Sequence, residues 1–161
     1  MTDDERFMQR AIELAKQAAA LGEVPVGAIV VKRATGEIVG EGYNRRESDK
    51  SPLAHAELLA ISEASRRLGG WRLIGCALYV TLEPCPMCAG AIINSRVERL
   101  VYGASDGKAG SCGTVVDLFA YPYNHIPEIE RGVMGGECAA LLSDFFKELR
   151  LRRKADRSEP L

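Results

Sequence analysis

Residues 77–94 read ALYVTLEPCPMCAGAIIN, and this stretch decides the fold. Its first five residues are apolar or β-branched, which predicts a short buried strand over Ala77–Thr81. Pro86 suits the first position of a helix, because a residue there needs no partner for its N–H. A helix is therefore predicted from Pro86 to Asn94. A buried strand that leads into a helix is a building unit of α/β proteins.

The rest of the chain alternates helices and strands in the same manner. Apolar spacings of three and four positions predict the helices, and short β-branched runs around the turn at 33–36 predict a hairpin. In the second helix this spacing is carried by Leu58, Ile61, Ser65 and Leu68. The predicted elements are helix 3–21, strands 26–31 and 37–41, helix 54–68, strand 99–102, a last strand within 126–133 and a helix from 137 to about 153, with loops at 44–52 and 103–113.

These elements predict an α/β fold with a mixed sheet, since the sheet opens with an antiparallel hairpin and continues with strand–helix units. The chain has 161 residues, a usual length for one domain, and neither a linker nor an internal repeat divides it. We therefore expect a single domain over 1–161, with a frayed tail at about 155–161.

Composition argues against several classes of protein. The formal net charge is -1 and 47% of the residues are hydrophobic, which disfavours a disordered chain and a binder that is basic overall, although local patches average out in such a sum. Five unevenly spaced cysteines do not suggest a disulfide framework. The N-terminus lacks a signal-peptide pattern, and no apolar run reaches the roughly 18–20 residues of a membrane span. A soluble cytoplasmic protein without membrane contact is expected.

Cys85 and Cys88 are spaced to bind one metal ion. Cysteines three residues apart at a helix start lie one turn apart on one face, and the positive end of the helix dipole favours their thiolate forms. Zn²⁺ binds Cys sulfur and His nitrogen in tetrahedral geometry. His55 also opens a predicted helix, and it is the expected third ligand.

The fourth position of such a site decides its chemistry. A structural zinc site has four protein ligands, whereas a catalytic site leaves one position for a water whose pKa falls to about 7. The other three cysteines and His125 are isolated in the sequence, which favours an open site with Glu57 as the proton carrier. Residues i and i+2 of a helix point to different sides. His55 and Glu57 can therefore face one ion only if His55 lies at the helix start.

Each motif alone has an ordinary explanation. A Cys-x-x-Cys pair can be a redox couple, and His-x-Glu can be a helix cap beside a solvated carboxylate. A closed four-ligand zinc site in a non-catalytic binding module is a further alternative. The conjunction is more specific, because His55-Ala-Glu57 followed by Pro84-Cys85-Pro-Met-Cys88 matches the His-x-Glu…Pro-Cys-x-x-Cys signature of zinc deaminases.

The sequence resembles the bacterial tRNA adenosine deaminase family from about Phe7 to Arg153. The resemblance is carried by 23–28, 42–45, 54–57 and 81–91, which cytidine-deaminase-like enzymes share widely, and by 106–108, 124–125 and 137–146. The last of these, followed by a basic helical end, is the most discriminating. Arg46 and Gly107 depart from the usual proline and alanine, and the loop at 33–36 is slightly longer. These departures concern the mouth of the pocket and leave the zinc chemistry untouched.

The resemblance implies a three-layer α/β/α cytidine deaminase-like fold, with a central mixed sheet of about five strands flanked by helices. It also implies a homodimer with one Zn²⁺ per subunit, held by His55, Cys85 and Cys88. The implied activity is hydrolytic deamination of adenosine to inosine at the wobble position (34) of a tRNA anticodon, with Glu57 moving the protons. A deaminase of a free base or nucleoside, such as guanine or cytosine, is the alternative on the same zinc site.

Contacts with the anticodon stem-loop are implied as well. Six basic residues between Lys147 and Arg157 stand against Glu148 and Asp156. Such a run can bind phosphates, or it can be a solvated helix end whose cations suit the dipole. A free-base deaminase has no need of it. The residues implied in substrate binding are Val26, Asn44, Ala56, Pro84, Asp106, Lys108, Asn124, Phe146, Arg152 and Arg153.

Overall fold

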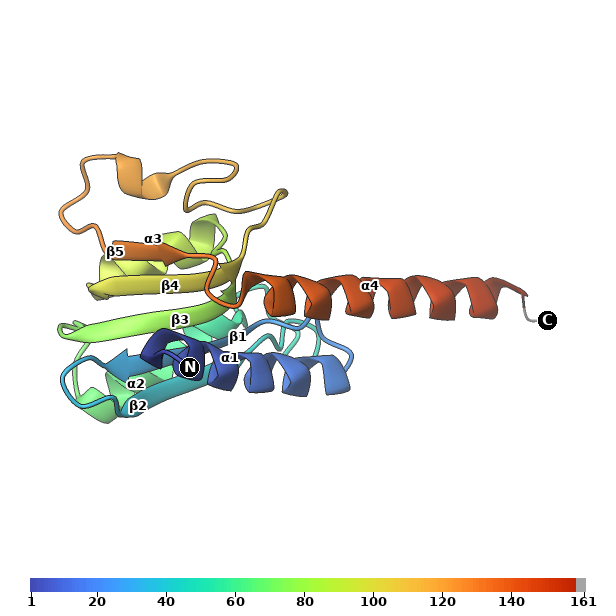
Figure 1. Ribbon diagram of the computed structural model, residues 1–161, viewed down its shortest axis with the longest axis horizontal. Helices are drawn as coiled ribbons and strands as arrows, with labels where there is room; N and C mark the ends of the chain where they lie inside the picture. The colour runs from blue at the N-terminus through green and yellow to red at the C-terminus, as the bar shows by residue number, and fades with distance from the viewer. Residues whose placement is uncertain (159–161) are drawn as a thin grey trace.

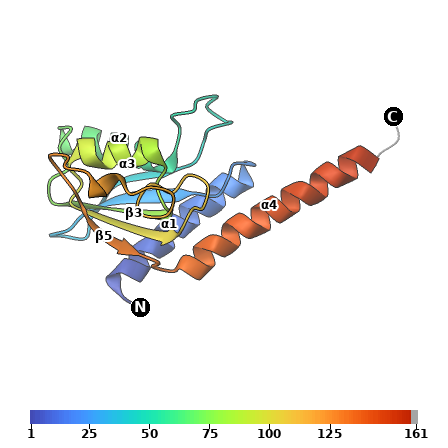
Figure 2. The same cartoon turned by 90° about the horizontal axis from the view of Figure 1, so that it is seen from above.

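A computed structural model describes residues 1–158, which form three layers (Figure 1). A five-stranded sheet lies in the middle, with α1 and α4 on one face and α2 and α3 on the other (Figure 2). The predicted α/β/α fold is confirmed. The elements are α1 (Asp3–Ala20), β1 (Gly27–Lys32), β2 (Ile38–Tyr43), α2 (Ala56–Leu68), β3 (Cys76–Leu82), α3 (Pro86–Ser95), β4 (Arg99–Ala104), the 3-10 helix η1 (Leu118–Ala120), β5 (Glu128–Arg131) and α4 (Gly135–Ser158).

The sheet has the strand order β2-β1-β3-β4-β5 and is mixed, as predicted. β1 pairs antiparallel with both β2 and β3, whereas β3, β4 and β5 run parallel. The start of β1 and the ends of β2, β3 and β4 therefore meet at one edge of the sheet. Four segments, 23–26, 44–48, 83–85 and 105–114, leave the strands at this edge, and they build the pocket described below.

Strands β1 and β3 are buried on both faces because helices cover both sides of the sheet. Along β1, Ala28 and Val30 belong to the core beneath α2 and α3, while Ile29 and Val31 belong to the core beneath α1. This arrangement explains why the sequence shows unbroken apolar runs at these strands instead of an alternating pattern.

Helix α2 packs very close to β2. A Cβ atom on Gly40 would overlap the carbonyl oxygen of Ala60, and a Cβ atom on Gly42 would overlap that of Ala56. Only glycine therefore fits at these two positions of the strand. Small side chains on the facing side of the helix allow the same close approach, and the buried residues of α2 are Ala56, Glu57, Ala60, Ile61 and Ala64.

The buried side of α2 differs from the pattern of large residues on which its prediction rested. Ile61 is buried, but Leu58 and Ser65 are only half-buried and Leu68 is exposed. That pattern was wrong as a guide to the core-facing side. It was built from the larger residues of the helix, whereas the side that packs against the sheet consists mostly of alanines. The helix itself lies where it was predicted, within two residues at its start.

The predicted boundaries hold within about two residues except at the C-terminal helix. Helix α4 continues to Ser158, beyond the predicted end near Arg153, so part of the tail expected to fray is helical. The remainder of that tail, 159–161, lies outside the described residues. The loop expected at 103–113 begins later, because Gly103 and Ala104 belong to β4, and η1 was not predicted. Within residues 1–158, no helix combines the length and apolar character needed to cross a bilayer.

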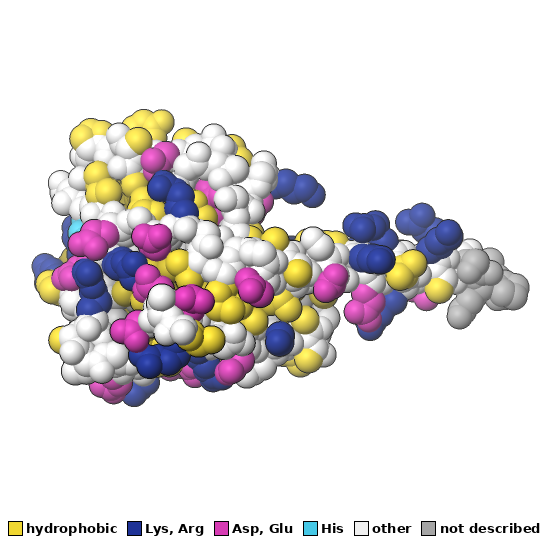
Figure 3. Space-filling model, viewed as in Figure 1, with side chains coloured by type: hydrophobic (Ala, Val, Ile, Leu, Met, Phe, Trp, Pro, Cys, Tyr) yellow, Lys and Arg dark blue, Asp and Glu magenta, His cyan; other side chains and the backbone are white. Residues whose placement is uncertain are grey.

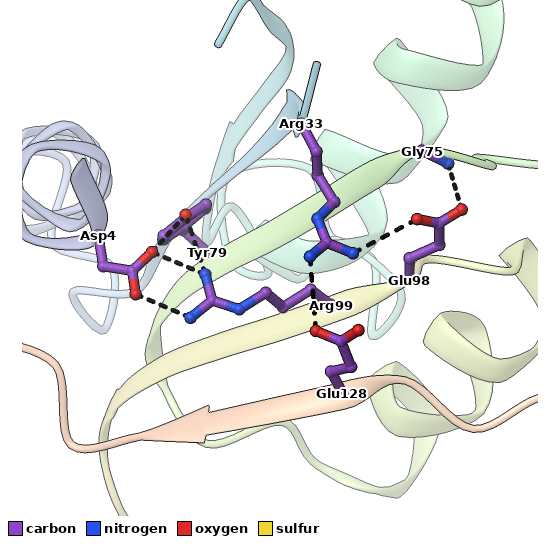
Figure 4. Close-up of polar contacts among 7 residues, drawn as sticks. All are labelled: Asp4, Arg33, Gly75, Tyr79, Glu98, Arg99 and Glu128. Carbon is purple, nitrogen blue, oxygen red and sulfur yellow. Dashed lines mark hydrogen bonds and ion pairs between the residues drawn. The ribbon is translucent and has the colours of Figure 1, made fainter. Parts of the chain in front are cut away.

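Polar contacts fasten the opposite edge of the sheet (Figure 4). Arg99 donates to both carboxylate oxygens of Asp4 at 2.7 and 2.8 Å, and the Tyr79 hydroxyl donates to Asp4 at 2.7 Å. The Arg99 guanidinium holds the pKa of Asp4 below its usual value. Arg33, in the hairpin turn, lies 3.4 Å from both Glu98 and Glu128. The first turn of α1 and the hairpin turn are thus tied to β3, β4 and β5.

Replacing Gly40 with alanine tests the close packing of α2. We expect the variant to lose at least about 2 kcal/mol of unfolding free energy, because the added methyl overlaps the backbone of the helix. Urea denaturation measures the loss. Gly70→Ala is the matched control, since nothing lies within 4 Å of a Cβ at that position, and it should change stability by less than about 0.5 kcal/mol. Equal stabilities for the two variants would contradict the packing argument.

Candidate active site and metal centre

His55 lies just outside the spiral of α2. It is the N-cap residue, with extended backbone angles of φ -83° and ψ 149°, and Glu57 follows in the first turn. His55 therefore lies at the helix start, as the sequence analysis required. Its backbone is not helical, so its side chain need not point away from that of Glu57. Both residues line the same pocket.

The two cysteines occupy the start of α3 in the same way. Cys85 is the N-cap residue with extended backbone, Pro86 takes the first helical position, and Cys88 lies one turn into the helix. Cys88 is fully buried, and Cys85 is half-buried at the pocket. Two helix N-termini, those of α2 and α3, thus meet at one point, and their partial positive charges favour thiolate sulfur there.

The three side chains form a compact ligand set. The Nδ1 atom of His55 lies 3.7 Å from the sulfur of Cys85 and 3.5 Å from that of Cys88, and all three ligand atoms lie within 4.8 Å of one another. A tetrahedral Zn²⁺ with bonds of about 2.3 Å to sulfur and 2.0–2.1 Å to nitrogen would separate N and S by about 3.5 Å. Donor types and spacing both fit zinc, and this cluster is the one such group among residues 1–158.

The charges of the cluster are strongly coupled. A hydrogen bond from Cys88 lowers the pKa of Cys85 to about 4, and the same contact, together with burial, raises the pKa of Cys88. The hydrogen bond to Cys85 raises the pKa of His55. One thiolate therefore forms readily, and the second sulfur holds a proton that a bound cation would displace.

Glu57 is a buried carboxyl at the edge of the ligand set. Its side chain is 4% exposed, and burial raises its pKa to about 7, against the opposing effects of its own backbone N–H and of His55. A carboxyl with a pKa near neutrality can both accept and release a proton during one reaction cycle. The arrangement suits the role of proton carrier predicted for Glu57.

A pocket of about 200 Å³ opens over the cluster. It contains four of the residues expected to bind substrate: Val26, Asn44, Ala56 and Asp106. Val26 and Asn44 flank the start of β1 and the end of β2, whereas Asp106 follows β4 on the other side of β3. Its complete lining is Val24, Val26, Asn44, Arg46, His55, Ala56, Glu57, Leu82, Glu83, Cys85, Asp106 and Ala109.

The amide of Asn44 is partly engaged within the protein. Its Nδ2 donates to the carbonyl oxygen of Val24 at 3.2 Å, and its Oδ1 accepts from the N–H of Arg46 at 3.1 Å. One amide hydrogen and one lone pair remain for a ligand. Asn44 thus also fixes the backbone on its side of the pocket, a role that the sequence did not suggest.

The other expected substrate contacts lie outside the pocket. Pro84 is buried and does not line the pocket, and its carbonyl oxygen accepts from the N–H of Ser111. Lys108 and Asn124 are exposed on the segment between β4 and β5. Three further expected contacts, Phe146, Arg152 and Arg153, are exposed on α4. Phe145 is half-buried and meets Phe146 edge to face at 5.4 Å, so the second ring is the one turned outward.

Five pocket residues were missed by sequence reasoning. Leu82 and Glu83 stand inside a quoted motif, and Val24 stands inside another, but none has a side chain that signals a ligand contact. Arg46 drew notice only as a departure from the usual proline. All five lie within five residues of the strand ends that meet at the same sheet edge, with Leu82 as the last residue of β3, and this position is the signal that would have found them. The five are Val24, Arg46, Leu82, Glu83 and Ala109.

A His–Cys–Cys ligand set at two helix starts, with a buried carboxyl beside it on a mixed sheet, defines the class of zinc-dependent deaminases. The chain belongs to the family described by the cytidine and deoxycytidylate deaminase zinc-binding region, which matches residues 1–104. The predicted zinc cofactor and deaminase fold are confirmed by this match. The assignment of His55, Cys85 and Cys88 as the zinc ligands stays a prediction, which their clustering supports.

Three proteins similar to this chain are a curated relative and two solved structures. The tRNA-specific adenosine deaminase of Bacillus subtilis (strain 168) is 51% identical over 158 residues, which cover 98% of this chain and 97% of the relative. A solved structure from work on tRNA:A34 deaminases, which edit A to I at the wobble position, has a TM-score of 0.82 at 40% identity and covers 85% of this chain and 99% of its own. A guanine deaminase from Bacillus subtilis has a TM-score of 0.61 at 40% identity, with 73% of each chain covered.

Removing one sulfur ligand tests the metal centre. We expect Cys88→Ala to abolish stoichiometric zinc binding, because two remaining ligands hold zinc far more weakly than three. Metal analysis of the purified protein measures zinc per chain. Cys76→Ala is the control, since Cys76 is equally buried but lies outside the cluster, and it should retain the wild-type zinc content. Zinc retained in Cys88→Ala would contradict the assignment of the ligands.

Proposed function

We propose that this protein is a zinc-dependent hydrolase that converts adenosine to inosine at the wobble position (34) of a tRNA anticodon. The observation that carries the proposal is the near-full-length similarity to a tRNA-specific adenosine deaminase. The His–Cys–Cys cluster with Glu57 beside it supports the chemistry, and the higher TM-score to a tRNA:A34 deaminase than to a guanine deaminase supports the substrate.

His55, Cys85 and Cys88 hold the zinc ion in this proposal. When bound, the ion supplies a Lewis acid that lowers the pKa of a coordinated water toward neutrality. Glu57 takes a proton from the attacking water and delivers it to ring N1, which makes C6 of the adenine electrophilic. The water oxygen bonds to C6, and Glu57 takes the remaining proton of the new C6 hydroxyl and passes it to the amino group. The C6–N bond then breaks and ammonia leaves. Water and adenosine give inosine and ammonia.

The burial of Glu57 favours an extruded base. Glu57 is 4% exposed and His55 is half-buried in a pocket that Val24, Val26, Asp106 and Ala109 also line, so in this proposal a base stacked within an RNA loop cannot reach them. A nucleotide turned out of the stack can. In this proposal the remaining amide hydrogen and lone pair of Asn44 bind this nucleotide, and the backbone N–H of Ala56 at the start of α2 binds the base; both residues line the pocket.

The exposed end of α4 is the proposed phosphate-binding surface. Lys and Arg side chains gather along its protruding part (Figure 3). Arg152 is paired with Glu148 at 2.6 Å, so the neighbouring Arg153 and Lys154 supply more of the available charge. Asp106, Lys108, Asn124 and Phe146 are the further proposed contacts with the anticodon loop.

We also propose a cytoplasmic homodimer. Translation and its tRNA substrates lie in the cytoplasm, and the described residues contain no membrane-spanning helix. A shallow apolar groove formed by Leu53, Leu58, Leu59 and Ile61 lies beside the start of α2, with Leu53 60% exposed. A second copy of this chain would remove that surface from water.

Replacing Glu57 separates proton transfer from metal binding. We expect Glu57→Ala to keep one zinc per chain while kcat on an anticodon stem-loop falls by about 10²–10⁴-fold. Inosine is quantified by digestion and chromatography, beside parallel assays with free adenosine, guanine and cytosine. Glu63→Ala on the same helix is the control and should behave as wild type. Faster turnover of free guanine than of the stem-loop by the wild type would favour the alternative function.

Reversing Arg152, Arg153 and Lys154 to Glu tests the proposed phosphate-binding surface. We expect tRNA affinity to fall at least about tenfold and the slope of log K against log salt to decrease by about two or more. Reversal of Arg66, Arg67 and Arg72 at the opposite sheet edge changes the net charge equally and is the control. Binding measured across a salt series gives both values. An unchanged slope would rule out the surface.

Light scattering tests the dimer. We expect the wild type to have the mass of two chains, and Leu53→Glu with Leu58→Glu to shift it to one, because the charges oppose burial of the groove. Ile74→Glu is the control, since Ile74 is equally apolar and 68% exposed but lies elsewhere. A wild type with the mass of one chain would refute the proposal.

A further inference from the structure

Two buried carboxylates lie at the pocket, Glu83 in its lining and Glu23 next to the lining residue Val24, and the proposed reaction does not use them. Glu23 is 1% exposed and Glu83 is 2% exposed, although glutamate is rarely buried without a partner. Neither forms an ion pair within residues 1–158. Each carboxylate instead accepts hydrogen bonds from the backbone of a loop that lines the pocket.

Glu83 accepts four hydrogen bonds from one loop. Its Oε1 accepts from the N–H of Asp106 at 3.1 Å and from the hydroxyl of Thr114, and its Oε2 accepts from the N–H groups of Cys112 and Thr114 at 3.0 and 3.1 Å. A carboxylate has about four acceptor sites, so this set uses the group completely.

The same loop packs tightly against this carboxylate at Gly110. A Cβ on Gly110 would overlap the carboxyl group of Glu83 and the carbonyl oxygen of Asp106. The loop 106–114 is therefore wrapped around the side chain of Glu83. Asp106 and Ala109 of this loop form one wall of the pocket, and Glu83 itself stands two residues before the zinc ligand Cys85.

Glu23 plays the corresponding part on the other wall. Its Oε1 accepts from the N–H of Glu47 at 3.1 Å, and its Oε2 accepts from the N–H of Ser48 at 2.6 Å. Val24, which follows Glu23, and Arg46, which precedes Glu47, both line the pocket. The carboxylate thus joins the segment before β1 to the loop after β2.

We propose that Glu23 and Glu83 are positioning residues that set the two walls of the pocket and thereby the binding of the RNA around the target adenosine. The inference rests on the proposed function for its substrate. It assigns neither residue to the chemical step. Charge is essential to the role, because every partner is a donor, and glutamine would set its own N–H groups against some of them.

Four variants test the proposal: Glu83→Gln, Glu23→Gln, Thr114→Val and Thr114→Ser. Thr114 is exposed, and its hydroxyl reaches Glu83 from the surface, so its variants fold even if Glu83→Gln does not. Hydrogen–deuterium exchange of the zinc-loaded protein reports the loops without any substrate. Kinetics on the anticodon stem-loop report kcat and KM separately, and metal analysis reports zinc.

The two glutamine variants should have the same kinetic effect but should loosen different loops. Exchange should accelerate within 106–114 in Glu83→Gln and at 47–48 in Glu23→Gln, each leaving the other loop as in the wild type. KM should rise about tenfold in each, with kcat within about twofold and zinc unchanged. Thr114→Val should raise KM by about threefold and accelerate exchange in 106–114, and Thr114→Ser should restore both.

Unchanged exchange in the two loops of the glutamine variants would overturn the proposal. A fall in kcat with loss of zinc in Glu83→Gln would also overturn it, because Glu83 would then support the metal ligands. Failure of the proposed function is distinguishable, because it appears as an inactive wild type in the same assay. The exchange results in the two loops and the comparison of Thr114→Val with Thr114→Ser still decide the positioning role in that case.

Discussion

The close approach of α2 to the sheet is the constraint on which the rest of the molecule depends. Gly40 and Gly42 leave space on β2, and alanines on the helix fill it. Because the helix lies so near the sheet, its N-cap residue His55 lies at the edge of the sheet where β1 begins and β2, β3 and β4 end. His55 can then reach the two sulfurs at the start of α3. A larger side chain at either glycine would move the histidine as well as the helix.

Electrostatics at this edge follow from the same packing. Two helix N-termini point at one place, which favours negative charge there, and a Cys85 thiolate satisfies that preference. Glu57 is held in the same region but away from water, so burial raises its pKa instead of lowering it. The same backbone geometry therefore places a thiolate beside a carboxyl whose pKa is raised. Glu23 and Glu83 are a third case. Burial opposes their charged form, but hydrogen bonds from the side chains of Ser48 and Thr114 and from backbone N–H groups lower the pKa of each carboxyl.

The sequence predicted the layers, the mixed sheet and the zinc ligands because each has a local signal. The Cys-Pro-x-Cys pattern at 85–88 indicates both a helix start and a pair of metal ligands, and β-branched runs indicate buried strands. The core-facing side of α2 could not be predicted in the same way, because small residues carry it. Residues such as Leu82, Glu83 and Val24 reach the pocket only through the convergence of four segments, which depends on strand order. The length of α4 was also underestimated, because a basic, polar segment carries no apolar spacing by which to extend a helix.

The exposed last part of α4 has a thermodynamic consequence. Residues 150–157 are all exposed, so this part of the helix gains little from burial and depends on its own hydrogen bonds and on side-chain pairs such as that between Arg152 and Glu148. Helices of this kind are in equilibrium with unfolded turns, and their helicity falls on warming. Ligand binding to this segment would thus be coupled to a helix–coil transition. Calorimetry at several temperatures would record that transition as a binding enthalpy that becomes more favourable as the free segment loses helicity.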